Sequence, residues 1–256
     1  MISSESIKKH IKNEALCVKV YDLIDSTNAE AKRYASAADL EDFSSVLFVA
    51  REQSAGRGRM GRQFLSRSDC GLYMSLLYFT SGELCGAVQV TTAAASVVAL
   101  AIEKVTGKRM HIKWVNDIYN ECGKVCGILA ETLPVRGGYA IIVGIGINIG
   151  DQPFPEELKK IASSVGDLKG EESRLIALIA DNLLSHAENG ADHSYMDAYR
   201  ERFMLTGEMV DLFRADEKIL GGEVVGVDDD GGLLLLPEGE TEVVAVRSGE
   251  ISLRRK

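Results

Sequence analysis

The chain has 256 residues, of which 46% are hydrophobic and 26% are charged, and its formal net charge is −9. This length suits one large domain plus a small one, and the apolar content is too high for an intrinsically disordered chain. The negative charge disfavours binding to nucleic acid or to an acidic membrane unless basic residues gather locally.

Up to about residue 206, strand-like runs alternate with helical stretches. The helix predicted at Thr27–Ala37 opens with Thr27 and Glu30 at capping-box spacing. The helix predicted at Gly86–Thr106 contains too many polar residues for a membrane span, so we expect it in the core. The other predicted elements are the strands Cys17–Tyr21, Ser45–Arg51, Tyr73–Phe79, His111–Tyr119, Lys124–Leu133 and Tyr139–Ile149 and the helices Glu171–Asn189 and Ser194–Phe203.

This mixture predicts an α+β fold over residues 1–206, in which helices flank a mixed β-sheet. From Gly207 onward the pattern changes to short β-rich runs that are separated by turns containing glycine and proline. This pattern of short strands and turns predicts a small closed β-barrel over residues 207–256. Its strands are predicted at Met209–Phe213, Gly222–Val227, Leu233–Leu236, Val243–Val246 and Ile251–Leu253.

Two features indicate the compartment of the protein. The N-terminal segment lacks the continuous apolar stretch of a signal peptide. The five cysteines form no C-x-x-C pair, which favours reduced thiols over a disulfide framework or a zinc site. We therefore expect a cytoplasmic protein.

Three arginines and three glycines form the segment Gly56–Arg62, shortly after a predicted strand. Glycine permits close backbone approach to a ligand, and arginine donates forked hydrogen bonds to phosphate and carboxylate groups. The segment therefore predicts a mobile anion clamp. A solvated basic loop and a nucleic-acid contact are the alternatives, and the acidic balance of the chain disfavours the second.

A second candidate segment has the sequence KWVND. Because side chains alternate along a strand, we expect Lys113, Val115 and Asp117 on one face and Trp114 and Asn116 on the other. This arrangement predicts a cation and a carboxylate on one rigid face. An exposed ion pair, which contributes about 0–1 kcal/mol, is the alternative.

The stretch Ile141–Ile149 predicts a strand with two unlike faces. One face carries only β-branched residues, whereas the other carries Gly144, Gly146 and Asn148. Glycine weakens a strand, so two glycines on one face indicate that something lies against the backbone there. The Asn148 amide then matches the donor and acceptor pattern of an adenine edge. Close packing of a helix is the alternative.

Polar residues mark the entry to the first long predicted helix, at Asp25, Ser26, Thr27 and Asn28. Helix capping alone explains such residues. Their hydroxyl and amide groups also supply the donors and acceptors that a cyclic urea needs. Further along, Lys124 follows a predicted turn, where it either extends a charge over a site or merely flanks a hairpin.

Together and in this order, these segments resemble the catalytic and C-terminal parts of biotin protein ligases, which are related in fold to lipoate ligases. The resemblance implies a class II synthetase-like sheet domain followed by a small Src-homology-3-like β-barrel. Each motif is weak alone, but the ordered set is specific. The matching segments are Asp25–Asn28, Gln53 with Gly56–Arg62, Lys113–Asp117, Lys124 with Gly127–Leu129, Gly144–Asn148 and Gly249–Leu253.

Three positions depart from the family pattern. Val115 replaces a proline and restores a backbone N–H. Phe64 replaces a tryptophan and lacks its indole donor, and Met60 stands where a basic residue is common, which weakens the expected clamp. About 20 residues precede the similar region, too few for the three-helix DNA-binding domain of repressor members, so we expect no repressor activity.

The resemblance implies an ATP-dependent ligase. The carboxylate of biotin attacks the α-phosphate of ATP to give biotinyl-5'-AMP and pyrophosphate, and a lysine of a biotin carboxyl carrier domain then takes the biotinyl group. Preorganised cations must offset the repulsion between the two anions, and magnesium is expected with ATP, without an assigned protein ligand. The expected catalytic residues are Lys113, Lys124, Asp117 and Arg59.

The resemblance also assigns the remaining site residues. Asp117 is expected to orient Lys113 or a magnesium ion, or to position the attacking lysine. Biotin is expected to bind Ser26, Thr27, Asn28, Gln53, Arg57, Gly58, Arg59 and Lys124. ATP or the adenylate is expected to bind Arg57, Arg59, Arg62, Phe64, Lys113, Asn116 and Asn148.

Other functions compete with this interpretation. The nearest is a lipoate or octanoate ligase of the same general fold. A non-catalytic biotin sensor and a nucleic-acid-binding regulator belong to other classes; the set of cations disfavours the first and the acidic net charge the second. We expect no DNA or membrane partner, and a homodimer stays open because family members pair through an exposed sheet edge.

Overall fold

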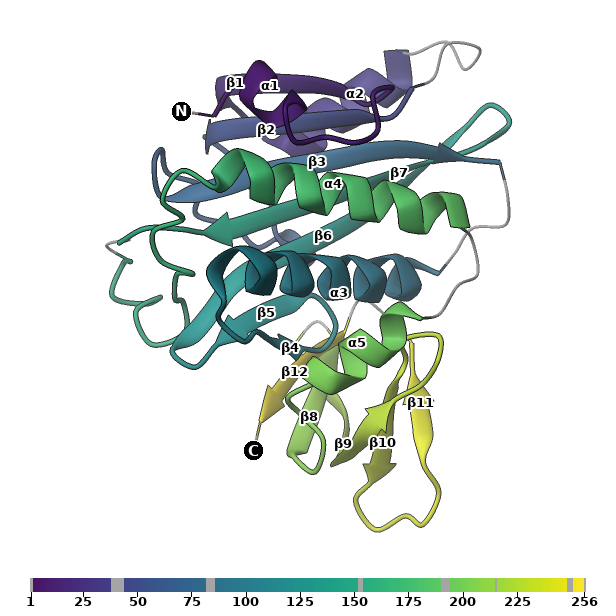
Figure 1. Cartoon of the computed structure of the whole chain (residues 1–256). Helices are drawn as coiled ribbons and strands as arrows, with labels where there is room; N and C mark the ends of the chain where they lie inside the picture. The colour runs from purple at the N-terminus through teal and green to yellow at the C-terminus, as the bar shows by residue number, and fades with distance from the viewer. Residues whose placement is uncertain are drawn as a thin grey trace.

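The computed structural model describes residues 2–37, 44–81, 86–151, 154–189, 194–214, 216–247 and 251–255. Two β-sheets organise these residues, a seven-stranded sheet and a five-stranded sheet (Figure 1). Gly249 and Glu250, which belong to the last predicted motif, lie outside the described residues, as does Cys85.

The seven-stranded sheet has the order β1-β2-β3-β7-β6-β5-β4. β1 pairs in parallel with β2, and the other neighbouring strands are antiparallel. The predicted mixed sheet is therefore confirmed. Its strands are β1 (Cys17–Ile24), β2 (Val46–Gln53), β3 (Gly71–Thr80), β4 (His111–Lys113), β5 (Asp117–Asn120), β6 (Gly123–Val135) and β7 (Gly138–Asn148).

Helices cover both faces of this sheet (Figure 1). One face carries α1 (Ser4–Lys8), α3 (Ala87–Thr106) and α4 (Glu172–Asn189), and the opposite face carries α2 (Thr27–Ala37). α5 (Tyr195–Arg202) packs against α3 and lies between it and the second sheet.

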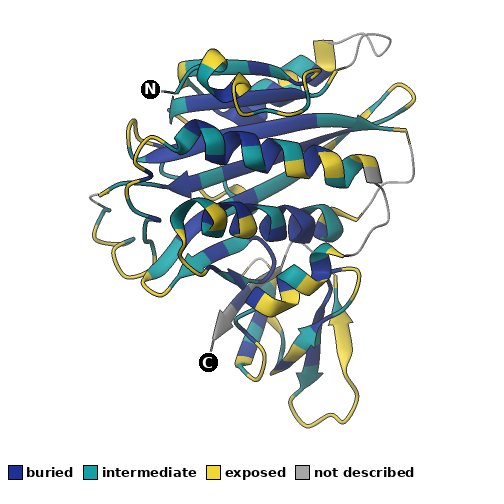
Figure 2. Ribbon diagram, viewed as in Figure 1, coloured by how far each residue is buried: buried dark blue, intermediate teal, exposed yellow. Residues whose placement is uncertain are grey.

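Strand alternation decides which side chains enter which layer. In β7, Ile141, Val143, Ile145 and Ile147 join the core beneath α3 and α4, as the sequence predicts. On the other face, Ile142 packs into a smaller core under α2. Figure 2 shows that the central strands are the most continuously buried part of the sheet.

The five-stranded sheet is antiparallel throughout and has the order β11-β10-β9-β8-β12. The predicted small all-β unit is confirmed, and its closure into a barrel stays a prediction. Among the described strands, β11 and β12 do not pair with each other, because short β11 pairs with β10 alone. The strands are β8 (Met209–Arg214), β9 (Glu217–Val227), β10 (Leu233–Pro237), β11 (Val244–Val246) and β12 (Ile251–Arg255).

Within the described part of the chain, α3 is the one helix that is long and apolar enough to cross a membrane by length and composition. Most of it is buried in the protein, where it packs against α4, α5 and β6. The expectation of a core helix is therefore confirmed.

The segment predicted as one strand at His111–Tyr119 is instead a tight hairpin. β4 ends at Lys113, β5 begins at Asp117, and these two residues face each other across the hairpin. The predicted alternation of faces does not continue through residues 114–116. Lys113 and Asp117 nevertheless share one face of the sheet, as the sequence predicts, because directly paired residues of antiparallel strands do so. The alternation of apolar and polar residues breaks at Trp114 and Val115, and contacts from other elements hold the turn.

α2 begins at Thr27 as predicted, but the predicted capping box is wrong. The Thr27 hydroxyl forms hydrogen bonds with the Gln53 carbonyl oxygen at 3.1 Å and with the Ser75 hydroxyl at 2.7 Å. The Glu30 carboxylate accepts a hydrogen bond from the Tyr21 hydroxyl at 3.2 Å. The start of α2 is thus tied by side chains to strands β2 and β3.

Candidate active site

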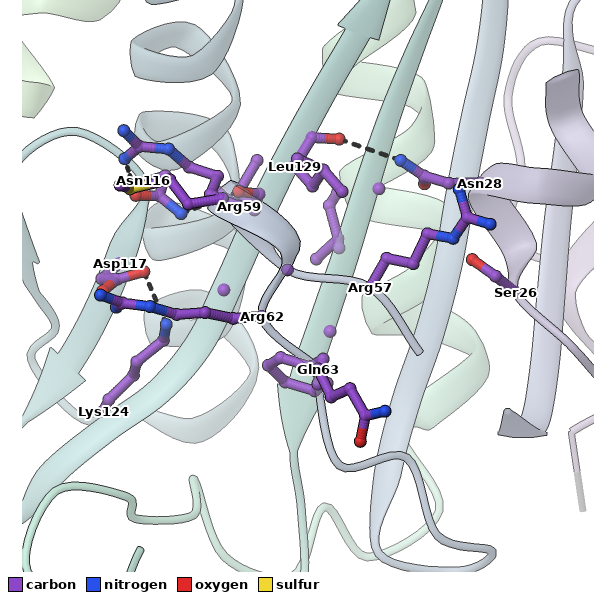
Figure 3. Close-up of a pocket in the computed structure, with 18 of the residues that line it drawn as sticks. Ser26, Asn28, Arg57, Arg59, Arg62, Gln63, Asn116, Asp117, Lys124 and Leu129 are labelled. Atoms are coloured by element: carbon purple, nitrogen blue, oxygen red, sulfur yellow. Dashed lines mark hydrogen bonds and ion pairs between the residues drawn. The ribbon is translucent and has the colours of Figure 1, made fainter. Parts of the chain in front are cut away.

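A cavity of about 580 Å³ lies on the face of the seven-stranded sheet that carries α2 (Figure 3). Its walls come from the start of α2, the arginine-rich segment after β2, the β4–β5 hairpin, and strands β6 and β7. All but one of the predicted site residues line it: Ser26, Thr27, Asn28, Gln53, Arg57, Gly58, Arg59, Arg62, Phe64, Lys113, Asn116, Asp117 and Lys124.

One end of the cavity is polar but largely uncharged. Ser26, Thr27 and Asn28 are buried there. The Gln53 carbonyl oxygen accepts from the Thr27 backbone N–H at 2.8 Å, and the Gln53 amide donates to the Ser66 hydroxyl at 2.8 Å. These hydrogen bonds fix the orientation of several donors and acceptors before a ligand arrives.

Asn28 lies directly over Gly144. A Cβ atom on Gly144 would lie 2.1 Å from the Asn28 side-chain oxygen. The Asn28 amide donates to the Leu129 carbonyl at 3.3 Å and to the Glu131 carboxylate at 2.8 Å, and its oxygen accepts from the Ser75 hydroxyl at 2.6 Å. Only glycine at position 144 leaves room for this network.

Phe64 covers the second glycine of β7. A Cβ atom on Gly146 would lie 2.5 Å from the Phe64 ring, and one on neighbouring Gly127 would lie 3.3 Å from both the ring and the Lys124 ammonium. Protein side chains therefore lie against the glycine face, and at Gly144 this is the helix-packing alternative. Side chains from α2 and from the segment after β2 fill that space.

The arginine loop (residues 56–62) is a compact reverse turn. The Gly58 N–H donates to the Arg62 carbonyl at 2.8 Å, and Met60 and Gly61 have left-handed φ values of 56° and 72°. A bulky residue pays about 1–2 kcal/mol for this conformation, so Met60 makes the tip of the loop less stable than glycine would. The predicted mobility of the loop stays a prediction.

The other end of the cavity is rich in cations. Figure 3 shows Arg59 pointing to Asn116, and the Arg59 guanidinium donates to the Asn116 oxygen at 2.6 Å. The Asn116 amide in turn donates to the Ile128 carbonyl at 2.9 Å. Burial lowers the pKa of Arg59, with nearby Arg62 acting in the same direction, while the charge of Asp117 opposes both.

Asp117 is the one carboxylate among the residues that line the cavity. It forms an ion pair with Lys124 at 2.7 Å, although Lys113 faces it across the hairpin. Lys124 is thus a partner of Asp117 that the sequence did not single out, and the orientation of Lys113 by Asp117 stays a prediction.

No group of three or more His, Cys, Asp or Glu residues within the described ranges could hold a metal ion. Magnesium usually keeps several waters and binds one or two carboxylates together with substrate phosphates. Asp117, at the cationic end, fits a magnesium ion that arrives with a nucleotide.

Asn148 is the predicted site residue that does not line the cavity. Its amide donates to the Ser163 carbonyl at 2.9 Å and to the Lys124 carbonyl at 3.5 Å. The Lys124 N–H also donates to the Ile161 carbonyl at 2.8 Å, so the chain after β7 braces the start of β6. Recognition of adenine by Asn148 stays a prediction.

The cavity also contains residues that the sequence did not assign. Most belong to segments that the sequence had singled out, whereas no spacing pattern connects Ile161 to the others. The unassigned lining residues are Met60, Gln63, Trp114, Gly127, Ile128, Leu129, Gly144, Ile145, Gly146, Ile161 and Leu253.

Comparison with known proteins shows which family this chain belongs to. The biotin/lipoate A/B protein ligase family matches residues 20–148, and the biotin protein ligase C terminal domain matches residues 206–254. The bifunctional ligase/repressor BirA of Bacillus subtilis is 33% identical over 264 residues, which cover 98% of this chain and 79% of the relative. The chain belongs to the biotin/lipoate A/B protein ligase family.

Two further similar proteins, one compared by sequence and one by structure, are named as biotin ligases. The biotin–[acetyl-CoA-carboxylase] ligase of Paracoccus denitrificans is 29% identical, covering 86% of this chain and 94% of the relative. The biotin protein ligase from Aquifex aeolicus in complex with biotin and ATP is 30% identical, with a TM-score of 0.77 over 94% of this chain and 99% of that chain. The resemblance and the fold class that the sequence predicts are confirmed.

Proposed function

We propose that the protein is a biotin protein ligase. It activates biotin with ATP to biotinyl-5'-AMP, releases pyrophosphate, and transfers biotin to one lysine of a biotin carboxyl carrier domain. The observation that carries this proposal is a single cavity with an uncharged polar end and a cationic end. Such a cavity suits a neutral cyclic urea joined through an aliphatic chain to a carboxylate that reacts with a nucleotide.

The uncharged end is assigned to the head group of biotin. Ser26, Thr27, Asn28 and Gln53 supply hydroxyl and amide groups for the urea carbonyl and its two N–H groups. In Figure 3 the Arg57 side chain lies beside Ser26 and Asn28, so one cation borders these uncharged groups, and we assign Arg57, with Gly58, to biotin.

The cationic end is assigned to the reacting groups. A carboxylate oxygen of biotin bonds to the α-phosphorus of ATP, and the bond to the pyrophosphate oxygen breaks. Negative charge from both partners gathers at this point, and fixed cations stabilise it more strongly than water does. The cations are Arg59, Arg62, Lys113 and Lys124, and Phe64 and Asn116 complete this end.

A magnesium ion bound with ATP would be held by Asp117, and it would neutralise charge on the phosphate oxygens. In the second step, the amine of the carrier lysine attacks the biotinyl carbonyl, and AMP leaves. We assign Asp117 to positioning that amine as well, since it already holds the Lys124 ammonium at 2.7 Å.

The arginine loop is assigned as a lid over the mixed anhydride. Arg59 fastens the loop to Asn116 on the opposite wall of the cavity. A closed loop would keep water from the reactive intermediate until the carrier domain docks.

The decisive experiment incubates the purified protein with ATP, magnesium, biotin and a biotin carboxyl carrier domain, and then probes the carrier with streptavidin. Biotinylation that requires both ATP and magnesium is the expected result. A parallel reaction with lipoate distinguishes the rival lipoate ligase, and equal or better transfer of lipoate would overturn the biotin assignment. Binding of biotin without transfer would favour a sensor.

The proposed function also includes the compartment and the partners of the protein. We place the protein in the cytoplasm, with a carboxylase carrier domain as partner and without a role in DNA binding. An electrophoretic shift on random DNA tests the last point, since a shift at physiological salt would contradict it. Size-exclusion chromatography with and without biotin and ATP tests the homodimer.

A further inference from the structure

One contact joins the five-stranded sheet to the active-site hairpin. The indole N–H of Trp114, in the turn between β4 and β5, donates to the carbonyl of Gly231 at 2.9 Å. Both residues are buried, and Trp114 also lines the cavity. A backbone group outside the seven-stranded domain therefore holds a wall of the active site.

The β9–β10 turn (residues 228–232), which carries this carbonyl, is itself tightly fixed. The Asp228 carboxylate accepts from the backbone N–H groups of Asp230 at 3.0 Å and Gly232 at 2.7 Å. Gly231 has a φ of +81°, and a Cβ atom there would lie 2.8 Å from the Thr92 side chain on α3. The turn fits against α3 only because residue 231 is glycine.

Three consecutive residues, 114–116, connect this contact to Arg59. Next to Trp114, the Val115 carbonyl accepts from the buried Tyr199 hydroxyl at 3.3 Å. Asn116 then accepts the 2.6 Å hydrogen bond from Arg59. A shift of the Trp114 indole would therefore be transmitted along this short turn to the group that holds Arg59.

We propose that the β9–β10 turn positions Arg59 for the nucleotide, through the Trp114 indole and Asn116. This inference rests on the proposed ligase function. Gly231 and the Trp114 N–H act as positioning groups, because their effect passes through Arg59. The uncharged end, built by α2 and β2, has no part in this path, so the turn controls the use of ATP and leaves the affinity for biotin unchanged.

Two glycines make a matched test. Gly231 and Gly239 both lie in turns of the five-stranded sheet, with φ values of +81° and +80°, so alanine incurs a similar backbone penalty at each. A Cβ atom on Gly239 would meet nothing within 4 Å. Gly231→Ala displaces the turn from Thr92, whereas Gly239→Ala is the control.

The kinetic measurement is biotin-dependent ATP–pyrophosphate exchange. We expect Gly231→Ala to raise the KM for ATP by about fivefold or more, equivalent to about 1 kcal/mol, with the KM for biotin within about twofold of wild type. Gly239→Ala should change neither value. Equal behaviour of the two variants, or equal changes in both KM values, would overturn the proposal.

Trp114 is the single tryptophan of the chain, so intrinsic fluorescence reports on the contact itself. Gly231→Ala should shift the emission to longer wavelength as the indole loses its buried partner, and Gly239→Ala should leave it unchanged. Thr92→Ala removes the side-chain atoms that a Cβ on residue 231 meets at 2.8 Å. The double variant with Thr92→Ala and Gly231→Ala should therefore recover part of the wild-type emission wavelength and part of the wild-type KM for ATP. An unchanged emission in Gly231→Ala contradicts the proposal.

The route through Arg59 is tested by a double-mutant cycle. In an Arg59→Ala background, Gly231→Ala should change the KM for ATP by less than about twofold, because the group it positions is gone. An undiminished effect would overturn the route. If Gly231→Ala does not fold, Trp114→Phe removes the indole donor together with part of the buried ring and carries the same kinetic expectations. A wild-type protein without biotin-dependent exchange would instead refute the proposed function.

Discussion

Gly144→Ala is a small change with a large predicted effect, because the space beside this residue is already filled. The new Cβ atom would lie 2.1 Å from the Asn28 side-chain oxygen and 2.7 Å from its amide carbon. Asn28 is buried at the base of the uncharged end and cannot turn into solvent. The substitution must therefore displace Asn28, or the backbone of α2 or β7.

The cost follows from what Asn28 loses. Displacement strains or breaks its hydrogen bonds to Ser75, Glu131 and Leu129, which contribute about 0.5–1.5 kcal/mol each. Overpacking in a buried site adds about 1–3 kcal/mol. We expect Gly144→Ala to lower the free energy of unfolding by about 2–4 kcal/mol, and to weaken biotin binding more than tenfold in the protein that remains folded.

Urea denaturation and calorimetric titration with biotin measure the two effects. Gly226→Ala is the control, because Gly226 also lies in a strand and its added Cβ would meet nothing within 4 Å. In an Asn28→Ala background, which removes the contacted atoms, Gly144→Ala should cost little. If Gly144→Ala and Gly226→Ala have equal unfolding free energies, the steric reasoning is wrong.

Three further predictions concern charged residues. Lys124→Ala should slow pyrophosphate exchange more than tenfold, since one charge-assisted hydrogen bond contributes about 1.5–3 kcal/mol, and exchange at the wild-type rate would reject its role. Arg59→Ala should hasten loss of pre-formed adenylate by release and hydrolysis, and equal lifetimes would remove the lid role from the arginine loop. The hydrogen bonds from Arg33 lower the pKa of Asp25 to about 2, so Asp25 stabilises the fold above its unfolded pKa near 3.9 and loses this effect as the pH falls towards 2. Asp25→Asn should therefore be less stable than wild type at pH 7, by less than about 1 kcal/mol because Asp25 is half exposed, and the difference should shrink between about pH 4 and pH 2 in thermal unfolding.

Most of the correct predictions about the sheet came from the alternation of side chains between the two faces of a strand. In β7, Ile141, Val143, Ile145 and Ile147 enter the core under α3 and α4, and Gly144 and Gly146 lie on the opposite face, over the site. A periodic pattern of this kind is local, so one sequence contains all of it. The helices at Thr27–Ala37 and Ala87–Thr106 are predicted well for the same reason.

The errors lie where distant residues decide the local structure. The β4–β5 turn has a strand-like sequence, and it is held by Gly231 and Tyr199, which lie far away in the chain. The short helix α1 was not predicted, because two of its anchors, buried Ile7 and the hydrogen bond between Ser6 and Ser173, are tertiary contacts. No local pattern contains such information.

The ion pair between Asp117 and Lys124 helps to explain how one cavity can hold so many cations. Arginines and lysines crowded without a counter-charge would repel one another, and burial already lowers the pKa of Arg59. Asp117 supplies negative charge at this point, and its charge opposes the effect of burial on Arg59. Under the proposed function, phosphate groups that bind here would replace that charge, and they would free Lys124 for the reacting oxygens and Asp117 for a magnesium ion or the incoming amine. A single carboxylate would thus stabilise the cluster of cations and still leave those cations available to the substrate.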